Sequence, residues 1–330
     1  MIVVDDAARD DDAAVTPPVD SGAPPRDVAQ PPIDRPSGAD VVAPRDDVVT
    51  PRADVVEPVD LGSPVDTGPE PSLPLTAAQR ASLPVLDGAT VARVREIRAA
   101  GAARGMRANV FAKIGDSITE SGSFLFDIGE GWGDLGGYTA LQATVSFFRA
   151  QSIGGRNSFN RASVCATAGW TAARALEGDP SSPLRNELAA TRPAYAVVMY
   201  GTNDIDMATP DILQTNLTRI AQILEDNGTV PILSTIPDRT DRSAAGALAL
   251  TMNQRIRAIA AARHIPLMDF WAALQPLPAK GMDGDGIHPN VYRNNGDPQA
   301  GDFTSAGLRF GYNTRNLVTV LALDRVRAVQ

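Results

Sequence analysis

A serine, a histidine and an aspartate are spaced so that they could act together as a nucleophile, a base and an orienting acid. Ser117 lies in the stretch GDSITE directly after an apolar run, and His288 lies in GDGIHPN, three residues after Asp285. A serine hydroxyl needs a base at neutral pH, and an imidazole with an ordinary pKa near about 6.5 can provide one. An aspartate nearby can hold the imidazole in the required tautomer. The three residues therefore predict nucleophilic catalysis.

Acyl transfer by Ser117 would also require hydrogen-bond donors for the negative charge that develops on the carbonyl oxygen. The candidates are the backbone N–H of Ser117, the backbone N–H of Gly169 and the side-chain amide of Asn203. Each follows the end of a predicted strand, and the carboxyl ends of parallel strands lie along one edge of a sheet. We therefore predict an oxyanion hole formed by these three donors.

The four blocks that carry these residues resemble, in order, those of the SGNH or GDSL-type serine hydrolases. GDSIT resembles the first block, Gly169 the glycine of the second, GTND with Asn203 the third, and DGIHPN the last. The resemblance implies a small flavodoxin-like α/β sandwich and ester hydrolysis without a metal or an organic cofactor. It also implies that Ser117, His288 and Asp285 are the catalytic residues. Isoleucine stands where the family usually has leucine in the first block.

The elements that must position these residues alternate between short apolar runs and longer amphipathic ones. A helix is predicted over 89–100, and apolar residues spaced by three or four predict further helices over 138–148, 213–224 and 248–259. Strands are predicted over 109–114, 162–166, 194–200, 230–235 and 265–269. Five strands separated by helices predict a three-layer α/β/α sandwich with a five-stranded parallel sheet.

The first 75 residues have a different composition from the rest of the chain. They contain no Phe, Trp or Tyr, 14 of the 26 prolines and 16 of the 39 acidic residues, with only five arginines and no lysine. Such a segment buries too little apolar surface to offset the entropy of ordering it. We expect a disordered acidic tether over 1–75 and a hydrolase domain over 76–330, with net charges of −11 and +2 respectively.

Charge and hydropathy also limit the expected partners. No basic stripe with interleaved aromatic residues suggests nucleic acid, and no apolar run approaches the roughly 20 residues that span a bilayer. The expected substrate is a small-molecule or polysaccharide ester, and the sequence identifies no protein partner. Acidic proline-rich tethers are typical outside the cell, so we expect an exported protein whose leader lies upstream. If Met1 is the true start, the expectation is a cytoplasmic protein.

Several alternatives stand beside this interpretation. Ser117 could cap a helix, since serine is favoured there, and the chain could be a non-catalytic carbohydrate-binding or surface-display module. GWGDLG at 131–136 matches a dinucleotide-binding pattern, but Glu130 and Asp134 would repel a pyrophosphate. We expect a mobile loop bordering the cleft, with Trp132 either contacting substrate or packing. Asp116 and Asp204 are expected to hold their turns through hydrogen bonds.

Overall fold

The computed structural model describes residues 66–68 and 73–329. Most of the predicted tether, 1–65 and 69–72, lies outside these described residues. The described part of the tether contacts the domain. The backbone N–H of Thr67 donates to the carbonyl oxygen of Leu86 at 3.0 Å, and Asp66 pairs with Arg325 of the C-terminal helix. Residues assigned to the tether therefore include some that bind the domain.

Four parallel strands form the central sheet in the order β1–β2–β3–β4. They are β1 (Arg107–Gly115), β2 (Pro193–Met199), β3 (Val230–Ser234) and β4 (Leu267–Met268). Every residue of β2 and β3 is buried, which explains why these strands are nearly continuous apolar runs. The register pairs Ile114 with Val198, so β1 and β2 end at the same edge of the sheet.

The prediction of a fifth strand over 162–166 is wrong. This stretch meets the sheet only through a parallel bridge between Ala166 and Gly115, at the outer edge of β1. Just before the bridge, the hydroxyl of Ser163 accepts from the N–H of Cys165, and the Glu187 carboxylate accepts from the N–H of the residue between them. Because side chains take these N–H groups, the segment turns instead of extending a ladder.

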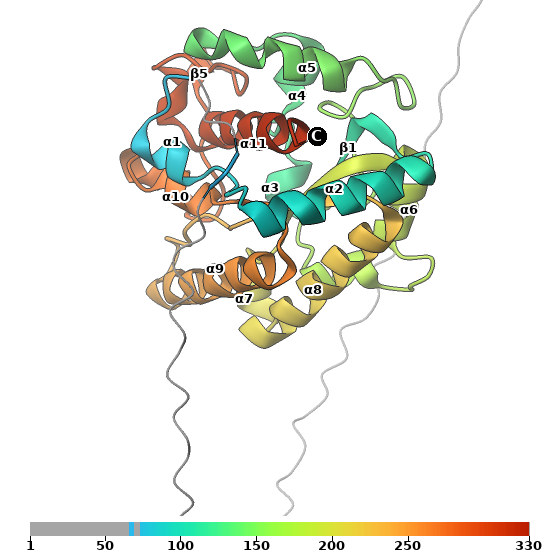
Figure 1. The fold of residues 1–330 in the computed structure, drawn as a ribbon. Helices are drawn as coiled ribbons and strands as arrows, with labels where there is room; N and C mark the ends of the chain where they lie inside the picture. The colour runs from blue at the N-terminus through green and yellow to red at the C-terminus, as the bar shows by residue number, and fades with distance from the viewer. Residues whose placement is uncertain (1–65, 69–72, 330) are drawn as a thin grey trace, which may run out of the picture. The chain divides into compact units, whose positions relative to one another are not determined.

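Helices cover both faces of this sheet, which confirms the predicted layers (Figure 1). On one face, α5 (Gln142–Arg149) contacts β1, and α11 (Gly311–Arg327) contacts β4 and α5. On the other, α8 (Pro210–Asn227) and α9 (Ser243–Arg263) contact β3 and each other. The helix predicted over 89–100 is α2 (Gly88–Ala103), which contacts β2, β3 and α8.

Shorter elements occupy the connections. They are α1 (Ala77–Ala81), α3 (Ser117–Glu120), α4 (Phe126–Glu130), α6 (Pro183–Thr191), α7 (Asp204–Met207), α10 (Phe270–Leu274), the 3₁₀ helices η1 (Gly136–Leu141), η2 (Ala172–Leu176), η3 (Pro278–Gly281) and η4 (Gly307–Arg309), and a hairpin of β5 (Arg293–Asn294) and β6 (Asp297–Pro298). Two of them matter for the site, because α3 follows β1 and α7 follows β2 at the carboxyl edge of the sheet.

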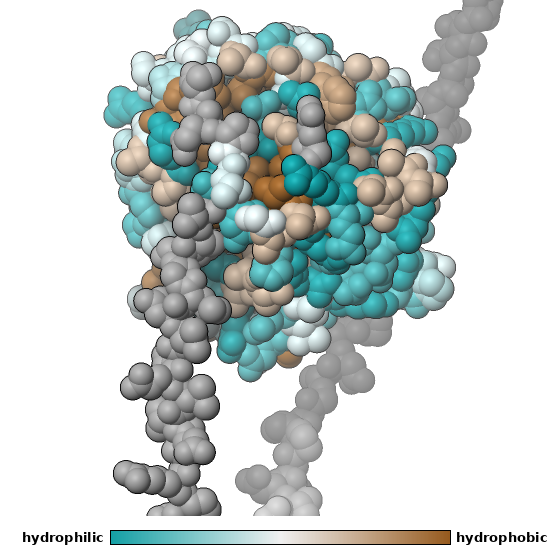
Figure 2. Space-filling model, viewed as in Figure 1, coloured by the Kyte–Doolittle hydropathy of each residue, from teal (hydrophilic) through white to brown (hydrophobic). Residues whose placement is uncertain are grey.

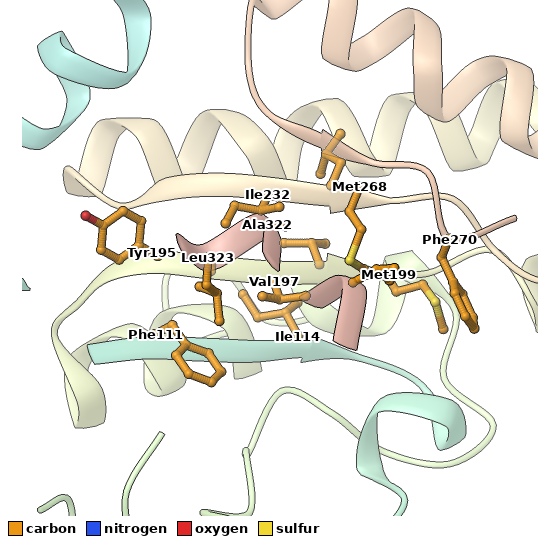
Figure 3. Close-up of a cluster of buried hydrophobic side chains, with 14 of the residues drawn as sticks. Phe111, Ile114, Tyr195, Val197, Met199, Ile232, Met268, Phe270, Ala322 and Leu323 are labelled. Atoms are coloured by element: carbon orange, nitrogen blue, oxygen red, sulfur yellow. The ribbon is translucent and has the colours of Figure 1, made fainter. Parts of the chain in front are cut away.

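The C-terminal helix α11 is the element that the pattern of apolar residues does not predict. Fifteen of its 17 residues are buried, polar ones included, so it has no hydrophilic face to reveal an amphipathic period. Figure 3 shows Ala322 and Leu323 of α11 among side chains from the sheet, with Val197 of β2 and Ile232 of β3 nearby. The helix therefore completes the hydrophobic core on its face of the sheet.

The surface visible in Figure 2 is mostly hydrophilic, with apolar surface confined to separate patches. Among the side chains that the structure describes, Trp132 is the most exposed of the large hydrophobic ones, at 68%. Within residues 66–68 and 73–329, no helix has both the length and the apolar character needed to cross a membrane.

Candidate active site

The predicted nucleophile, base and acid lie together at the carboxyl edge of the sheet. The hydroxyl oxygen of Ser117 is 2.9 Å from Nε2 of His288, although the residues are 171 positions apart in the chain. On the other side of the ring, Nδ1 of His288 is 2.6 Å from Oδ2 of Asp285. A proton on Nδ1 would be donated to the carboxylate, which leaves Nε2 free to accept the proton of the serine hydroxyl.

The Asp285 carboxylate is oriented and kept ionised by its own loop. Its Oδ1 accepts from the backbone N–H groups of Ile287 and His288, each at 2.9 Å. Burial raises the pKa of Asp285, but the hydrogen bonds from these N–H groups and from the imidazole outweigh that effect and lower the pKa below its usual value. A negative charge therefore faces the ring at neutral pH, where it would stabilise an imidazolium.

Ser117 is presented by a tight turn between β1 and α3. The carboxylate of Asp116 caps α3, since its Oδ1 accepts from the N–H of Ile118 at 3.1 Å. This confirms that Asp116 holds the turn. At Gly115 a Cβ atom would lie 2.3 Å from the hydroxyl oxygen of Thr119, so only glycine leaves room for the chain to turn here. The serine is thus the first residue of the short helix.

The carboxyl group of Asp116 is unsuited to replace Asp285 as the partner of the histidine. It is completely buried, and its Oδ2 has no hydrogen-bond partner among the described residues. Burial raises the pKa of Asp116 to about 7, against the opposing effects of the nearby Arg315 guanidinium and the Ile118 N–H. The group is therefore held largely neutral below that pH.

The loop that carries Asp285 and His288 is anchored by a segment that the sequence analysis did not single out. The backbone N–H of Thr240 donates to the carbonyl oxygen of Gly286 at 2.8 Å. Next to it, the buried Arg239 donates from Nε to the Asp241 carboxylate at 2.8 Å and from Nη1 to the carbonyl oxygen of Thr202 at 2.9 Å. The segment 239–241 therefore links the GTND turn, through Arg239, to the histidine loop, through Thr240.

The three predicted oxyanion donors come from turns at the same edge. Gly169 has a φ of +76°, a conformation that favours glycine, and a Cβ there would meet nothing within 4 Å. The amide of Asn203 donates to the carbonyl oxygen of Trp170 at 3.0 Å, so it lies against the Gly169 turn. Within the described part of the chain, the N–H groups of Ser117 and Gly169 donate to no residue. Both remain available to a ligand.

Two carboxylates hold the turn that contains Gly169. Both oxygens of Asp204 accept from the N–H of Ala172 at 3.3 Å, so this carboxylate, predicted to hold its own turn, binds the neighbouring turn of the second block. Burial raises the pKa of Asp204 to about 6. On the other side, the Glu120 carboxylate accepts from the N–H of Ala168 at 2.6 Å. Glu120 is the last residue of the helix that begins at Ser117, so the first two blocks are joined directly.

Arg315 of α11 is a further supporting residue that sequence reasoning missed. It is fully buried, and it donates to the carbonyl oxygen of Ile118 at 2.6 Å and to the hydroxyl of Thr119 at 2.9 Å. Its guanidinium carbon lies 3.7 Å from the ring centroid of Phe124. Burial lowers the pKa of Arg315 to about 10. The only signal in the sequence was a cationic residue just before the apolar run at 317–323.

The fold and the site define the class of this protein. It is an α/β protein whose parallel sheet carries a hydroxyl, an imidazole and a carboxylate, in hydrogen-bonded order, at its carboxyl edge. The model of the GDSL-like Lipase/Acylhydrolase family matches residues 114–292. The chain belongs to this family, which confirms the resemblance drawn from the four sequence blocks.

A comparison with solved structures finds matches at low sequence identity. A GDSL-like lipase from Bacteroides thetaiotaomicron is 17% identical, with 71% of this chain and 98% of that chain covered and a TM-score of 0.39. A lipase/acylhydrolase from Enterococcus faecalis is 17% identical, with coverages of 64% and 93% and a TM-score of 0.43. A mutant of Axe2, an acetyl-xylooligosaccharide esterase from Geobacillus stearmophilus, is 17% identical, with coverages of 64% and 93% and a TM-score of 0.42. No curated protein matches the chain in sequence.

Proposed function

We propose that this protein is a serine ester hydrolase in which Ser117 is the nucleophile, His288 the general base and acid, and Asp285 the residue that orients the imidazole. The observation that carries the proposal is the continuous pair of short contacts, 2.9 Å from Ser117 to His288 and 2.6 Å from His288 to Asp285. A serine that only capped a helix would have no need of an oriented imidazole. The structural role considered for Ser117 is therefore the weaker reading.

The proposed reaction has two acyl-transfer steps. The Ser117 hydroxyl gives its proton to Nε2 of His288 while its oxygen attacks the acyl carbon of the ester. The N–H groups of Ser117 and Gly169 and the amide of Asn203 hold the resulting oxyanion. The imidazolium then protonates the departing alcohol, which breaks the ester bond and leaves an acyl enzyme. Water, deprotonated by His288, releases the acid and restores Ser117.

The proposed substrates are carboxylesters or O-acetyl groups on a carbohydrate. The same residues could pass the acyl group to an acceptor alcohol instead of water, and analysis of the products with and without an added alcohol separates these outcomes. Free acid as the main product in both cases fits the hydrolase. A new ester as the main product would replace hydrolysis by acyl transfer.

The test of the proposed function is a panel of p-nitrophenyl esters of different acyl length, assayed with wild type and Ser117→Ala. Removing a nucleophile that acts with its base costs about 10⁴-fold or more in turnover. Ser146→Ala, at an exposed position of α5, is the matched control and should keep the wild-type rate. Circular dichroism and thermal unfolding check that both variants fold. A rate for Ser117→Ala within a few-fold of wild type would refute the assignment.

A fluorophosphonate probe separates the esterase from the rival possibility of a non-catalytic module with the same fold. Such a probe reacts with a serine only when a base activates its hydroxyl. We expect one label on the intact chain, located at Ser117 by mass spectrometry, and no label on Ser117→Ala. A folded wild-type chain that resists the probe and hydrolyses no ester of the panel would favour the binding module.

A further inference from the structure

A pocket of about 630 Å³ lies next to the turn that follows α3, the helix that begins at the candidate nucleophile. One wall is the turn at Ser121–Ser123, which leaves the helix that begins at Ser117. The backbone N–H of Ser121 donates to the carbonyl oxygen of Ser117 at 3.0 Å. The opposite wall is 297–300, and the N–H of Gln299 in this wall donates to the carbonyl oxygen of Tyr292, four residues after His288, at 2.8 Å. The pocket thus adjoins both segments that carry the reacting groups.

Buried asparagines of α11 hold the two walls in place. The amide nitrogen of Asn316 donates to the carbonyl oxygen of Ser123 in one wall at 2.8 Å and to that of Ala300 in the other at 3.0 Å. The amide of Asn313 donates to the carbonyl oxygen of Gln299 at 2.7 Å. Since both side chains are fully buried, these bonds are protected from water and the spacing of the walls is built into the fold.

An exposed indole stands at the mouth of this pocket. Trp132 is 68% exposed, and its ring packs edge-on against Phe126 at a centroid distance of 6.0 Å. The guanidinium of Arg156 lies 5.6 Å from the other ring, that of Phe126. The N–H of Trp132 donates to the carbonyl oxygen of Asp127 at 2.9 Å, so the backbone that carries the indole is fixed. The indole does not pack into the core, which leaves contact with a ligand as its predicted role.

The loop around Trp132 is tied to the segment that follows the hairpin. The N–H of Asp134 donates to the carbonyl oxygen of Gly301 at 3.0 Å, and its carbonyl oxygen accepts from the N–H of Phe303 at 2.7 Å. The Asp127 carboxylate accepts from the N–H of Gly301 at 3.0 Å. The structure therefore gives the loop predicted to be mobile several backbone anchors, and the aromatic surface has a defined place.

The lining combines one flat apolar surface with many short polar groups. Besides the rings of Trp132 and Phe126, it offers the hydroxyls of Ser121 and Ser123, the amide of Gln299, and the carboxylates of Asp127 and Asp297. A pyranose ring has the complementary chemistry, because it has an apolar C–H face and a rim of hydroxyls that donate and accept hydrogen bonds. An acyl chain would leave these polar groups without partners. No cationic side chain is among the lining residues, which disfavours an anionic ligand.

We propose that this pocket is a glycan subsite, in which Trp132 stacks on a neutral pyranose ring while an adjacent part of the same molecule presents its ester to Ser117. The inference rests on the proposed function and narrows it to esters carried by neutral oligosaccharides or polysaccharides. Residues 297–300 lie outside the segment 114–292 that matches the family model, so the match does not cover this wall of the pocket.

The kinetic test compares two substrates in Trp132→Ala. We expect the ratio of kcat/KM for O-acetylated neutral oligosaccharides to kcat/KM for p-nitrophenyl acetate to fall at least tenfold, mainly through KM for the oligosaccharides. Trp132→Tyr, which keeps an aromatic face, should recover part of the ratio. Leu250→Ala removes another exposed hydrophobic side chain, on α9, and should leave the ratio unchanged. An unchanged ratio in Trp132→Ala would overturn the subsite.

The binding test does not depend on catalysis. Ser117→Ala is titrated with unacetylated cello- and xylo-oligosaccharides, with anionic oligogalacturonate and with octanoate, by calorimetry and by the change in tryptophan emission. We expect saturable binding of a neutral oligosaccharide to Ser117→Ala. We expect no such binding to the double variant that also carries Trp132→Ala. Binding of octanoate or oligogalacturonate alone, or of no probe, would overturn the inference.

The two tests separate the failure of the subsite from that of the enzyme. A wild type that hydrolyses p-nitrophenyl acetate but binds no neutral oligosaccharide is an esterase without this subsite. A chain that binds the oligosaccharide through Trp132 but hydrolyses no ester keeps the subsite and loses the proposed function.

Discussion

The segment that matches the family and the C-terminal segment after it contribute to the site in opposite ways. Residues 114–292 supply the groups proposed to react with a substrate, and the side chains of His288 and Asp285 are 37% and 46% exposed. Helix α11, within 293–329, supplies buried groups that contact only protein, such as Arg315 and Asn316 at 0% exposure. Reacting groups occur in turns with recognisable local sequences. The supporting groups lie on the buried helix α11. Their hydrogen-bond partners are distant in the sequence, so the local sequence does not reveal their role.

This difference predicts that substitutions in the first segment impair turnover and leave stability nearly intact. The largest effect short of removing the nucleophile is expected for Asp285→Asn. The amide cannot hold the imidazole in the required tautomer or stabilise its charge, and we expect kcat to fall by about 10⁴-fold. Ester hydrolysis and urea unfolding measure the two quantities. Asp283→Asn, an exposed neighbour in the same loop, is the control. A kcat for Asp285→Asn within tenfold of wild type would show that the histidine works without this partner.

A second, smaller effect in the same segment is expected for Asn203→Ala. Loss of one oxyanion donor costs about 10²- to 10³-fold in kcat, with little change in KM, because the charge develops only in the transition state. Asn227→Ala at the end of α8 is the control for loss of an asparagine elsewhere. A change confined to KM would mean that Asn203 binds the ground state of the substrate, and it would remove this residue from the proposed oxyanion hole.

The same contrast explains which parts of the molecule the sequence predicts. The predicted strands that correspond to β2 and β3 are nearly continuous apolar runs, and the last six residues of β1 are buried; both faces of such strands are covered in a parallel sheet. Ser117 and Asn203 are predictable because each stands in a turn after such a strand, and Asp285 and His288 because they stand in the histidine loop. Gly169 instead follows a stretch that only bridges the sheet. The stretch at 162–166 has the same composition as a strand, but its backbone N–H groups donate to the Ser163 hydroxyl and the Glu187 carboxylate, and it turns away from the sheet. Those partners cannot be inferred from local sequence.

Helix α11 escapes prediction for the complementary reason. Its polar side chains are buried because they donate hydrogen bonds to backbone carbonyl groups of distant segments. Asn313 donates a hydrogen bond to a carbonyl oxygen in the pocket wall at 297–300, and Arg315 donates to one in α3. Asn316 donates to carbonyl oxygens in both walls of the pocket. Read locally, these residues look like the solvent face of a helix that has no apolar stripe. Only the fold shows that the carbonyl group of Ile118, to which Arg315 donates, lies 197 positions away in the chain.

The supporting role of α11 is tested by Arg315→Met. The substitution would leave two buried acceptors, the carbonyl oxygen of Ile118 and the hydroxyl of Thr119, without their donor. We expect the free energy of unfolding to fall by about 2 kcal/mol or more. Since α3 carries Ser117, we also expect kcat to fall roughly tenfold with little change in KM. Urea unfolding and ester kinetics provide the measurements.

Two further variants sharpen the interpretation of Arg315. Arg309→Met, at an exposed position of η4, controls for loss of a cationic side chain and should resemble wild type. Arg315→Lys keeps a donor but cannot reach both acceptors in the same way, and it should recover part of the stability. Wild-type stability and kcat in Arg315→Met would mean that the second segment supports the site less than its buried bonds suggest.

Asp116 belongs to both groups, because it stands next to Ser117 in the first motif and is buried near Arg315. We expect Asp116→Asn to have the smallest effect on turnover, within a few-fold of wild type, because the amide oxygen can still accept from the N–H of Ile118. Its main effect concerns pH. In the folded protein the pKa of Asp116 is raised to about 7 from an ordinary value of 3.8, chiefly by burial.

A raised pKa in the folded state means that the folded protein holds this proton more tightly than the unfolded chain does. The stabilisation is fully present below about pH 3.8 and is lost as pH rises through about 7. Asp204, whose pKa is raised to about 6, contributes in the same direction. The difference in free energy of unfolding between wild type and Asp116→Asn should therefore shift against the wild type between about pH 4 and pH 7. Urea unfolding at pH 4.5, 5.5, 6.5 and 7.5 measures it. A difference that does not change with pH would mean that Asp116 is ionised in the folded protein, and would place it with the charged, reacting groups of the first segment.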